Sequence, residues 1–419
     1  MPFTLVHLPV ELLEMIALAL TAESDTVLSD EEQIIFQLRL VCREARNKLE
    51  TKFFYTYFTD RHLWLDDRKL AELDRLSQRA DLADRVKRLL VIGRPDPDNV
   101  GDTFTLGRSM VAPSGVAASL SQILPRLKNL RELKFTDTMR GDTTSSDRGH
   151  NVGSAFAAVL LATESCKCTI TALEFSSNNV REWRVVGIPD ARSMLFLSPS
   201  LAGLERLHLS ILCAPYLAKA STKYSSQASN VYESKLTVSS GSETGYELAL
   251  ALGRCTQLKD LSLRMLFTAE ATTAFAAPAS TLRLPELQKF ELSTSSCTAD
   301  TLGQFLLNHA SGLRHLSLLD IKFRRTSPVM LTSMLDLLRK SLELHTFEAE
   351  HLRIYAGDGN KLFSAISFPA LDHVYWHEDT SRDDYIVVRT QTSIHGVESV
   401  RHGLAQMKDC VAFTAYRKR

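Results

Sequence analysis

The feature of this sequence that most constrains its fold is a recurring hexapeptide, Leu-x-x-[Leu/Phe]-x-[Leu/Phe], in which every x is non-apolar. It occurs within NLRELKF, LERLHL, LKDLSL, LQKFEL and LRHLSL, where composition predicts fewer than about one chance match. A looser apolar-x-x-apolar-x-apolar pattern carries little information, because a chain with 44% hydrophobic residues yields roughly 35 chance matches. The strict form therefore indicates a repeated structural unit.

The repeat predicts parallel strands that alternate with helices. The last four intervals between its central apolar residues are 29, 26, 31 and 27 residues, near the period of leucine-rich repeats. Between them, TADTLGQFLLNHA and SPVMLTSMLDLLRKS are typical of helices. We therefore expect an α/β fold with an irregular leucine-rich-repeat-like solenoid over residues 51–384. Its central positions are Leu89, Leu133, Leu173, Leu207, Leu261, Phe290, Leu316, Phe347 and Val374.

Both ends of this region extend the pattern. Leu63, which lies 26 residues before Leu89, is expected to begin a degenerate first repeat. Residues 385–419 contain a strand-like YIVVRT and a helical SVRHGLAQMKD, and we expect this tail to cap the last repeat. A doubly wound α/β sheet would also alternate strands and helices, but it would not require the hexapeptide.

The N-terminal residues predict two amphipathic helices, LPVELLEMIALAL at 8–20 and EEQIIFQLRLVCREARNKLE at 31–50. Their apolar stripes are too extensive for two short helices to bury against each other alone. We therefore expect part of this surface to contact another domain or another protein.

At these residues the chain resembles an F-box, with an N-terminal Leu-Pro, an apolar helix and a second helix containing LRLVCREAR. The connection at 21–32 is long and acidic for an F-box, and the tryptophan often found near the end of the second helix is missing. The resemblance implies that residues 1–50 form an F-box-like helical module that docks onto the small adaptor of SCF cullin-RING ubiquitin ligases. The adaptor-binding residues that it implies are Leu8, Pro9, Leu12, Ile16, Leu38 and Val41.

The resemblance implies a substrate-recognition subunit of such a ligase, in which the solenoid binds a protein substrate and the partners perform the chemistry. A second hypothesis is a non-catalytic scaffold whose N-terminal helices merely cap the solenoid. A third is an enzyme on an α/β scaffold, although no nucleophile, base or metal set can be assembled from the sequence.

Charge and composition bear on partners and compartment. The chain has 49 basic and 49 acidic residues, which gives no long-range attraction for nucleic acids or anionic membranes. The longest apolar run found, at 155–162, is too short to span a bilayer. Seven scattered cysteines suit a reducing compartment, so we expect a cytoplasmic or nuclear protein.

The sequence contains no phosphate-binding loop, dinucleotide fingerprint or nucleophile elbow. We therefore expect no catalytic residue, no cofactor and no metal ion. Cys166 and Cys168 form a C-x-C without a second pair at metal spacing. His373 and His377 lie in a predicted strand, where four residues span about 13 Å, so the two rings could not share one ion.

The residues on either side of each central apolar position should face the concave surface of the solenoid, which is mixed in charge. Its C-terminal corner provides the candidate substrate-binding residues His373, Tyr375 and His377. The alternatives are a plain solvated face, or recognition by polar insertions such as 136–153 and 219–245. The sequence shows no arginine cluster on this surface that would mark a phosphate site.

Overall fold

The computed structural model describes residues 47, 58–65, 67–92, 113–136, 159–160, 162–163, 169–176, 202–212, 241–266, 271–355, 363–367, 373–378, 386–410 and 412–415. The chain divides into two compact units. Unit 1 comprises Met1–Gly141 and Leu161–Thr169, and unit 2 comprises Asp142–Leu160 and Ile170–Arg419. Within the described ranges, no helix combines the length and the apolar character that crossing a membrane requires.

Unit 1 contains three parallel strands, in which Leu89 lies opposite Leu133 as predicted. Leu63 lies opposite Val91 and not opposite Leu89, so the predicted alignment of the first repeat was wrong by two residues. A shift of two keeps the same face toward the core, and Leu63 is buried. The strands are β1 (Asp60–Trp64), β2 (Arg88–Ile92) and β3 (Glu132–Thr136), and the helices are α5 (Asp67–Ser77), α6 (Ala80–Ala83), α7 (Pro113–Ile123) and the short 3-10 helix η4 (Leu124–Arg126).

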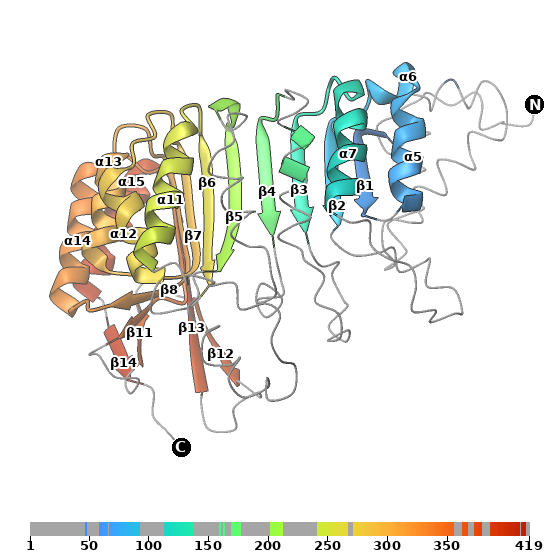
Figure 1. The fold of residues 1–419 in the computed structure, drawn as a ribbon. Helices are drawn as coiled ribbons and strands as arrows, with labels where there is room; N and C mark the ends of the chain where they lie inside the picture. Colours follow the sequence, from blue (N-terminus) through green and yellow to red (C-terminus); the bar gives the residue numbers. More distant parts are fainter. Residues whose placement is uncertain are drawn as a thin grey trace, which may run out of the picture. The chain divides into compact units, whose positions relative to one another are not determined.

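Unit 2 contains parallel strands that neighbour one another in sequence order, and its helices form a row beside them (Figure 1). A doubly wound sheet reverses its strand order at a switch point, and the run from β4 to β9 does not. These strands are β4 (Ala172–Ser176), β5 (Arg206–Leu212), β6 (Asp260–Leu266), β7 (Lys289–Cys297), β8 (His315–Arg324) and β9 (Thr346–Glu350). The helices are α11 (Gly241–Arg254), α12 (Ala271–Thr281), α13 (Ala299–Asn308) and α14 (Pro328–Ser341).

The predicted register is confirmed from β4 to β9. The central apolar residues lie directly opposite one another and are each at most 3% exposed. Because each strand sends them to the same face, they form a continuous core beneath the helices. These residues are Leu173, Leu207, Leu261, Phe290, Leu316 and Phe347.

A backbone contact recurs with the same period. The carbonyl two residues before each central position accepts two N–H groups from the next strand; for example, the Glu205 carbonyl accepts from Lys259 at 2.8 Å and Asp260 at 3.0 Å. This contact satisfies the backbone where each strand begins and fixes its register. The accepting carbonyls in unit 2 belong to Thr171, Glu205, Lys259, Gln288 and Arg314.

The two helices predicted from 298–310 and 327–341 are confirmed, and each begins at a side-chain cap. The Thr298 hydroxyl accepts a hydrogen bond from the Thr301 N–H, and the Ser327 hydroxyl accepts one from the Met330 N–H. Pro328 follows at the first helical position of α14, where its missing N–H costs nothing. These caps explain why both helices begin where they do.

A buried histidine joins α13 to the chain that precedes β7. Nε2 of His309 accepts the Leu284 N–H at 3.1 Å, which leaves Nδ1 to donate to the Phe305 carbonyl at 2.7 Å. This pair of contacts requires the neutral ring. Burial accordingly lowers the pKa of His309 below the usual histidine value.

Three adjacent repeats of unit 2 contain a residue with positive φ at the same place. Thr294, Asp320 and His351 have φ values of 48°, 55° and 55°, and each lies four residues after its central apolar residue. Thr294 lies within β7 and Asp320 within β8, whereas His351 directly follows β9; we call these three positions the kinks. Beyond Asp320, β8 leaves β9 and pairs with β10 (Arg353–Tyr355).

The C-terminal strand predicted at 385–390 and the helix predicted at 399–409 are confirmed as β13 (Ile386–His395) and α15 (Val397–Cys410). The expectation that Val374 continues the parallel repeat beside Phe347 was wrong. Strand β13 pairs antiparallel with β9 on one side and with β12 (His373–Glu378) on the other, so it separates the two. The remaining strands, β11 (Phe363–Ser367) and β14 (Ala412–Ala415), continue antiparallel from β10.

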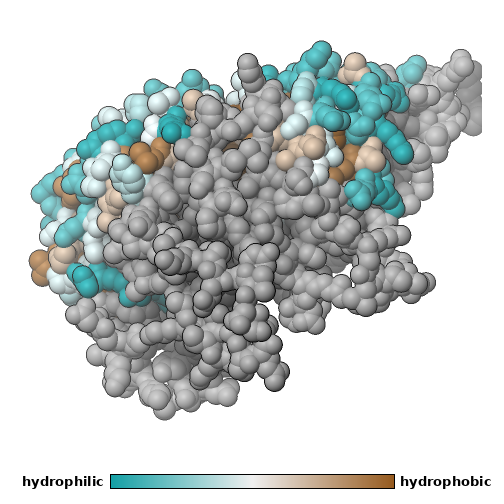
Figure 2. Space-filling view, viewed as in Figure 1, coloured by the Kyte–Doolittle hydropathy of each residue, from teal (hydrophilic) through white to brown (hydrophobic). Residues whose placement is uncertain are grey.

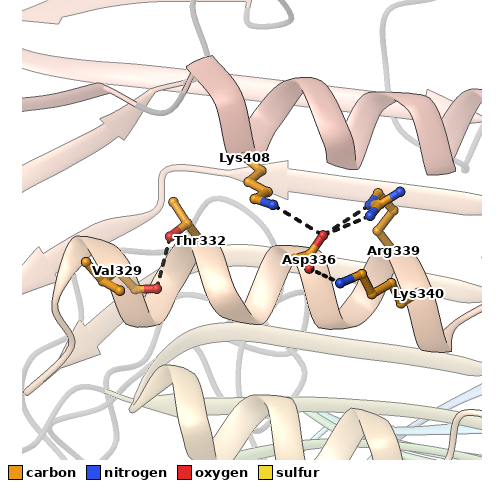
Figure 3. Close-up of polar contacts among 6 residues, drawn as sticks. All are labelled: Val329, Thr332, Asp336, Arg339, Lys340 and Lys408. Atoms are coloured by element: carbon orange, nitrogen blue, oxygen red, sulfur yellow. Dashed lines mark hydrogen bonds and ion pairs between the residues drawn. The ribbon is translucent and has the colours of Figure 1, made fainter.

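Helix α15 packs against α14, and one carboxylate joins them (Figure 3). Asp336 of α14 contacts Lys340 at 2.6 Å and Arg339 at 3.0 Å on its own helix, and Lys408 of α15 at 3.4 Å. The hydrogen bonds from Lys340 and Arg339 hold the pKa of Asp336 well below its usual range. The carboxylate is therefore charged at all ordinary pH values.

The outer surface of the described helices is mostly hydrophilic in the view of Figure 2, with scattered apolar spots. Among the residues whose side chains are described, the large apolar ones that are exposed are Tyr246 and Leu250 on α11 and Val329 on α14. Tyr246 and Leu250 lie four residues apart and therefore share one face of α11, whereas Val329 is a single exposed residue of α14, which is normal on a protein surface.

Candidate functional site

The strand side of unit 2 carries two rows of polar residues that flank the central apolar positions, and we call it the polar face. Strand pairing aligns each row across five strands, from β5 to β9. One row precedes the central residues and the other follows them. They consist of Arg206, Asp260, Lys289, His315 and Thr346, and of His208, Ser262, Glu291, Ser317 and Glu348.

Asp260 is the electrostatic centre of the first row. Its carboxylate lies 3.5 Å from Nε2 of His208 and 3.7 Å from Nζ of Lys289. Burial acts to raise the pKa of Asp260, but His208, Lys289 and Arg206 outweigh it and hold the pKa below the usual value. The group is therefore a fixed negative charge with positive neighbours on both adjacent strands.

The second row is joined by hydroxyl–carboxylate hydrogen bonds between neighbouring strands. The Ser262 hydroxyl donates to Glu291 at 3.1 Å, and the Ser317 hydroxyl donates to Glu348 at 3.2 Å. Both glutamates thereby keep a defined position on the face. Such preorganised carboxylates suit recognition of cationic or hydrogen-bond-donating groups on a protein surface.

Two histidines meet where β8 and β9 begin. The rings of His315 and His345 are 6.0 Å apart in an edge-to-face arrangement, and Nδ1 of His315 is 2.8 Å from the Thr346 hydroxyl. Burial, the charge of His345 and that of Lys289 lower the pKa of His315. Sequence reasoning did not single out His345, because it lies one residue outside the strand positions that the repeat defines.

The polar face consists of charged side chains and of hydroxyls that are hydrogen-bonded to carboxylates. Its serine hydroxyls donate to carboxylates of the neighbouring strands, Ser262 to Glu291 and Ser317 to Glu348. Over the described ranges, no three His, Cys, Asp or Glu side chains are grouped so that they could hold a metal ion. Cys166 and Cys168 lie outside those ranges.

The candidate substrate-binding residues His373, Tyr375 and His377 lie in β12, which confirms the predicted strand but not its predicted place. His373 lies opposite Gln391 of β13, and Gln391 lies opposite Glu350 of β9. His373 is therefore level with Glu350 instead of Thr346, a shift of four residues. The side chains of His373, Tyr375 and His377 lie outside the part of the chain that is described.

The six residues that the F-box resemblance implies for adaptor binding fall outside the described residues as well. The polar insertions at 136–153 and 219–245 also lie almost wholly outside them. The adaptor-binding residues are Leu8, Pro9, Leu12, Ile16, Leu38 and Val41.

Comparison with known proteins does not add a relative: no family model and no curated protein matches the chain.

Proposed function

We propose that this chain is the substrate-recognition subunit of an SCF-type cullin-RING ubiquitin ligase. In this proposal residues 1–50 bind the adaptor as an F-box, and the repeats form an irregular leucine-rich-repeat-like solenoid. The polar face of unit 2 binds a protein substrate, and the ligase partners perform the chemistry.

The observation that carries the substrate-binding half of the proposal is the alignment of the polar face. Its carboxylates are held in place by neighbouring strands, as at Ser262 with Glu291 and Ser317 with Glu348. Lys289 and Glu348 are nevertheless exposed to solvent. Ordered charges that remain accessible match the electrostatic complementarity by which protein interfaces select partners.

The adaptor half rests on the resemblance at residues 5–50, and the test is a change in those residues alone. We expect Leu8→Ala with Pro9→Ala, made in the full chain, to weaken capture of the purified adaptor at least tenfold. The thermal stability of unit 2 should be nearly unchanged, because the change lies outside its core. Equal adaptor capture by the variant and the unchanged chain would reject the F-box assignment.

The scaffold alternative is favoured by the long acidic connection at 21–32 and by the missing tryptophan. It predicts that the polar face captures the same partners whether or not the adaptor binds. Proximity labelling in cells, compared between the full chain and the Leu8→Ala, Pro9→Ala variant, separates the two. Loss of only the ligase subunits from the labelled set supports our proposal, whereas an unchanged set without ligase subunits supports a scaffold.

The substrate-binding region is tested at both of its candidate parts. We expect Glu348→Lys to reduce capture of the labelled substrates while adaptor capture stays the same, because it reverses a charge that Ser317 holds in place. Tyr375→Ala tests the corner in β12 in the same assay. If neither change affects the substrates, recognition lies elsewhere, such as on the polar insertions.

A further inference from the structure

The positive-φ residues of unit 2 alter which side chains the strands present. Before Asp320, Leu316 and Leu318 face the core; after it, Ile321 and Phe323 do so. The extra residue thus reverses the alternation, as in a β-bulge. Lys322 and Arg324 consequently point away from the core, on the side that carries the polar face.

The pairing of β8 with β10 adds a third cation to this region. Lys322 lies opposite Ser296 of β7 on one side and opposite Arg353 of β10 on the other. Nη2 of Arg353 is 2.6 Å from Asp320, and Nε of Arg324 donates to the Ser296 hydroxyl at 2.9 Å. We call Asp320, Lys322, Arg324 and Arg353 the kink cluster. It gathers three cationic side chains and one carboxylate.

The cations of the kink cluster are close enough to repel one another. Burial and the charges of Arg353 and Arg324, which together outweigh the opposing effect of Asp320, lower the pKa of Lys322 to about 8. At pH 7, a group with this pKa is still about nine-tenths protonated. The region therefore holds a partly buried excess of positive charge among the described residues.

Arg353 adds a directional feature. One of its donors, Nε, is buried and has no hydrogen-bond partner, although Nη2 is satisfied by Asp320. A buried donor without an acceptor is costly, and an incoming acceptor would relieve that cost. Lys322 and Arg324 make further contacts as well, so an anion would join an existing network.

We propose that the kink cluster binds a phosphate-class oxyanion. Such a group offers several acceptor oxygens to the planar donors of Arg324 and Arg353 and to the ammonium of Lys322, and it offsets their mutual repulsion. The anion is either free in solution or attached to a polypeptide. The site does not depend on what the N-terminal residues bind.

The test measures binding of inorganic phosphate to the full chain by calorimetry at pH 7, with ionic strength held constant by chloride. We expect saturable binding that weakens at least tenfold in Lys322→Met and in Arg324→Gln. Lys259→Met is the matched control. Lys259 is an exposed lysine of the same unit that pairs with Glu205, and it directly precedes β6, outside the kink cluster. It should bind phosphate as tightly as the unchanged chain.

Absence of saturable binding to the unchanged chain would overturn the proposal, as would equal affinity in a folded Lys322→Met. If circular dichroism shows that Lys322→Met does not fold, Arg324→Gln decides in its place. Affinity should also fall between pH 7 and pH 9 as Lys322 loses its proton. A phosphoserine tripeptide in a parallel titration distinguishes the sources: tighter binding than inorganic phosphate indicates a phosphorylated chain, and weaker binding indicates a free anion.

Discussion

The two halves of β8 show how one strand can present two different surfaces. Residues 315–319 pair with β9 and hold the polar face through His315–Thr346 and Ser317–Glu348 contacts. Residues 322–324 pair with β10 and carry the cations of the kink cluster. Asp320, with its positive φ, separates the halves. The core remains continuous across this residue, because Ile321 and Phe323 replace Leu316 and Leu318 as its buried side chains.

A repeat can thus gain a second surface without losing its register. Because Thr294 and Asp320 occupy the same place in adjacent strands, β7 and β8 remain paired on both sides of these two residues. The regular half is stabilised mainly by burial. The kinked half includes left-handed residues, each of which costs about 1–2 kcal/mol when it has a side chain.

The largest effect is expected in the regular half. Leu261→Ala should lower the free energy of unfolding by about 2–5 kcal/mol, because Leu261 is 0% exposed and its loss leaves a cavity. Urea denaturation measures the change. The control, Ser262→Ala on the same strand, should cost far less, since it removes one partly buried hydrogen bond. Similar losses at the two sites would contradict the observed assignment of the faces.

A smaller effect distinguishes the two halves directly. At Asp320, the Gly variant should be more stable than the Ala variant by about 1 kcal/mol, because glycine adopts positive φ without strain. At Ser262, in a regular strand, the order should reverse by a similar amount, because glycine there only increases the entropy of the unfolded chain. The same order at both sites would show that the kink is not a source of strain.

The dependence of stability on pH tests the hydrogen bonds of His309, which lies at the end of α13 on the helix side of unit 2. Because His309 is held neutral with a lowered pKa, the unfolded state binds the proton more readily than the folded state. The contribution of His309 is therefore complete above its unfolded pKa of about 6.5 and is lost as the pH falls from there toward the folded pKa. Urea denaturation at pH 7 and at pH 5 gives the free energy of unfolding at each pH. Between these two values the free energy of unfolding should decrease less in His309→Gln than in the unchanged chain. Identical losses would contradict the neutral bridge.

The smallest effect is expected where α14 meets α15. Asp336→Asn should lower the melting temperature by only about 1–3 °C, because ion pairs near solvent contribute little to stability. Raising the salt concentration should reduce the difference between the variant and the unchanged chain. A large loss would show that Lys408 and Asp336 anchor α15 more strongly than their geometry indicates.

The sequence predicted the regular half well because its information is local. Each strand from β4 to β9 carries its own central apolar residue, and the predicted opposition of Leu207, Leu261 and Phe290 is confirmed. The capped helices α13 and α14 were also predicted, from Thr298 and Ser327 onward. The repeat thus determined strand order and face together.

The kinked half and the C-terminal strands could not be predicted in this way. No residue type marks the kinks, since Thr, Asp and His occupy a conformation that usually favours glycine. The approach of Lys322 and Arg353 depends on pairing between strands whose residues lie about thirty positions apart, with no hexapeptide in β10. Likewise, nothing local in YIVVRT indicates that β13 lies between β9 and β12, so the place of His373 was wrong by four residues.

The position of β13 has a consequence for how the protein is made. A ribosome synthesises β9 first, and its antiparallel partner β13 begins only after residues 351–385 have followed. During that interval the edge of β9 that β13 will occupy displays unpaired N–H and carbonyl groups, which can pair with other chains. The pairing of β13 with β9 is therefore a late event during translation. A nascent chain that stops before Ile386 retains an unpaired edge of β9, which β13 covers in the finished protein.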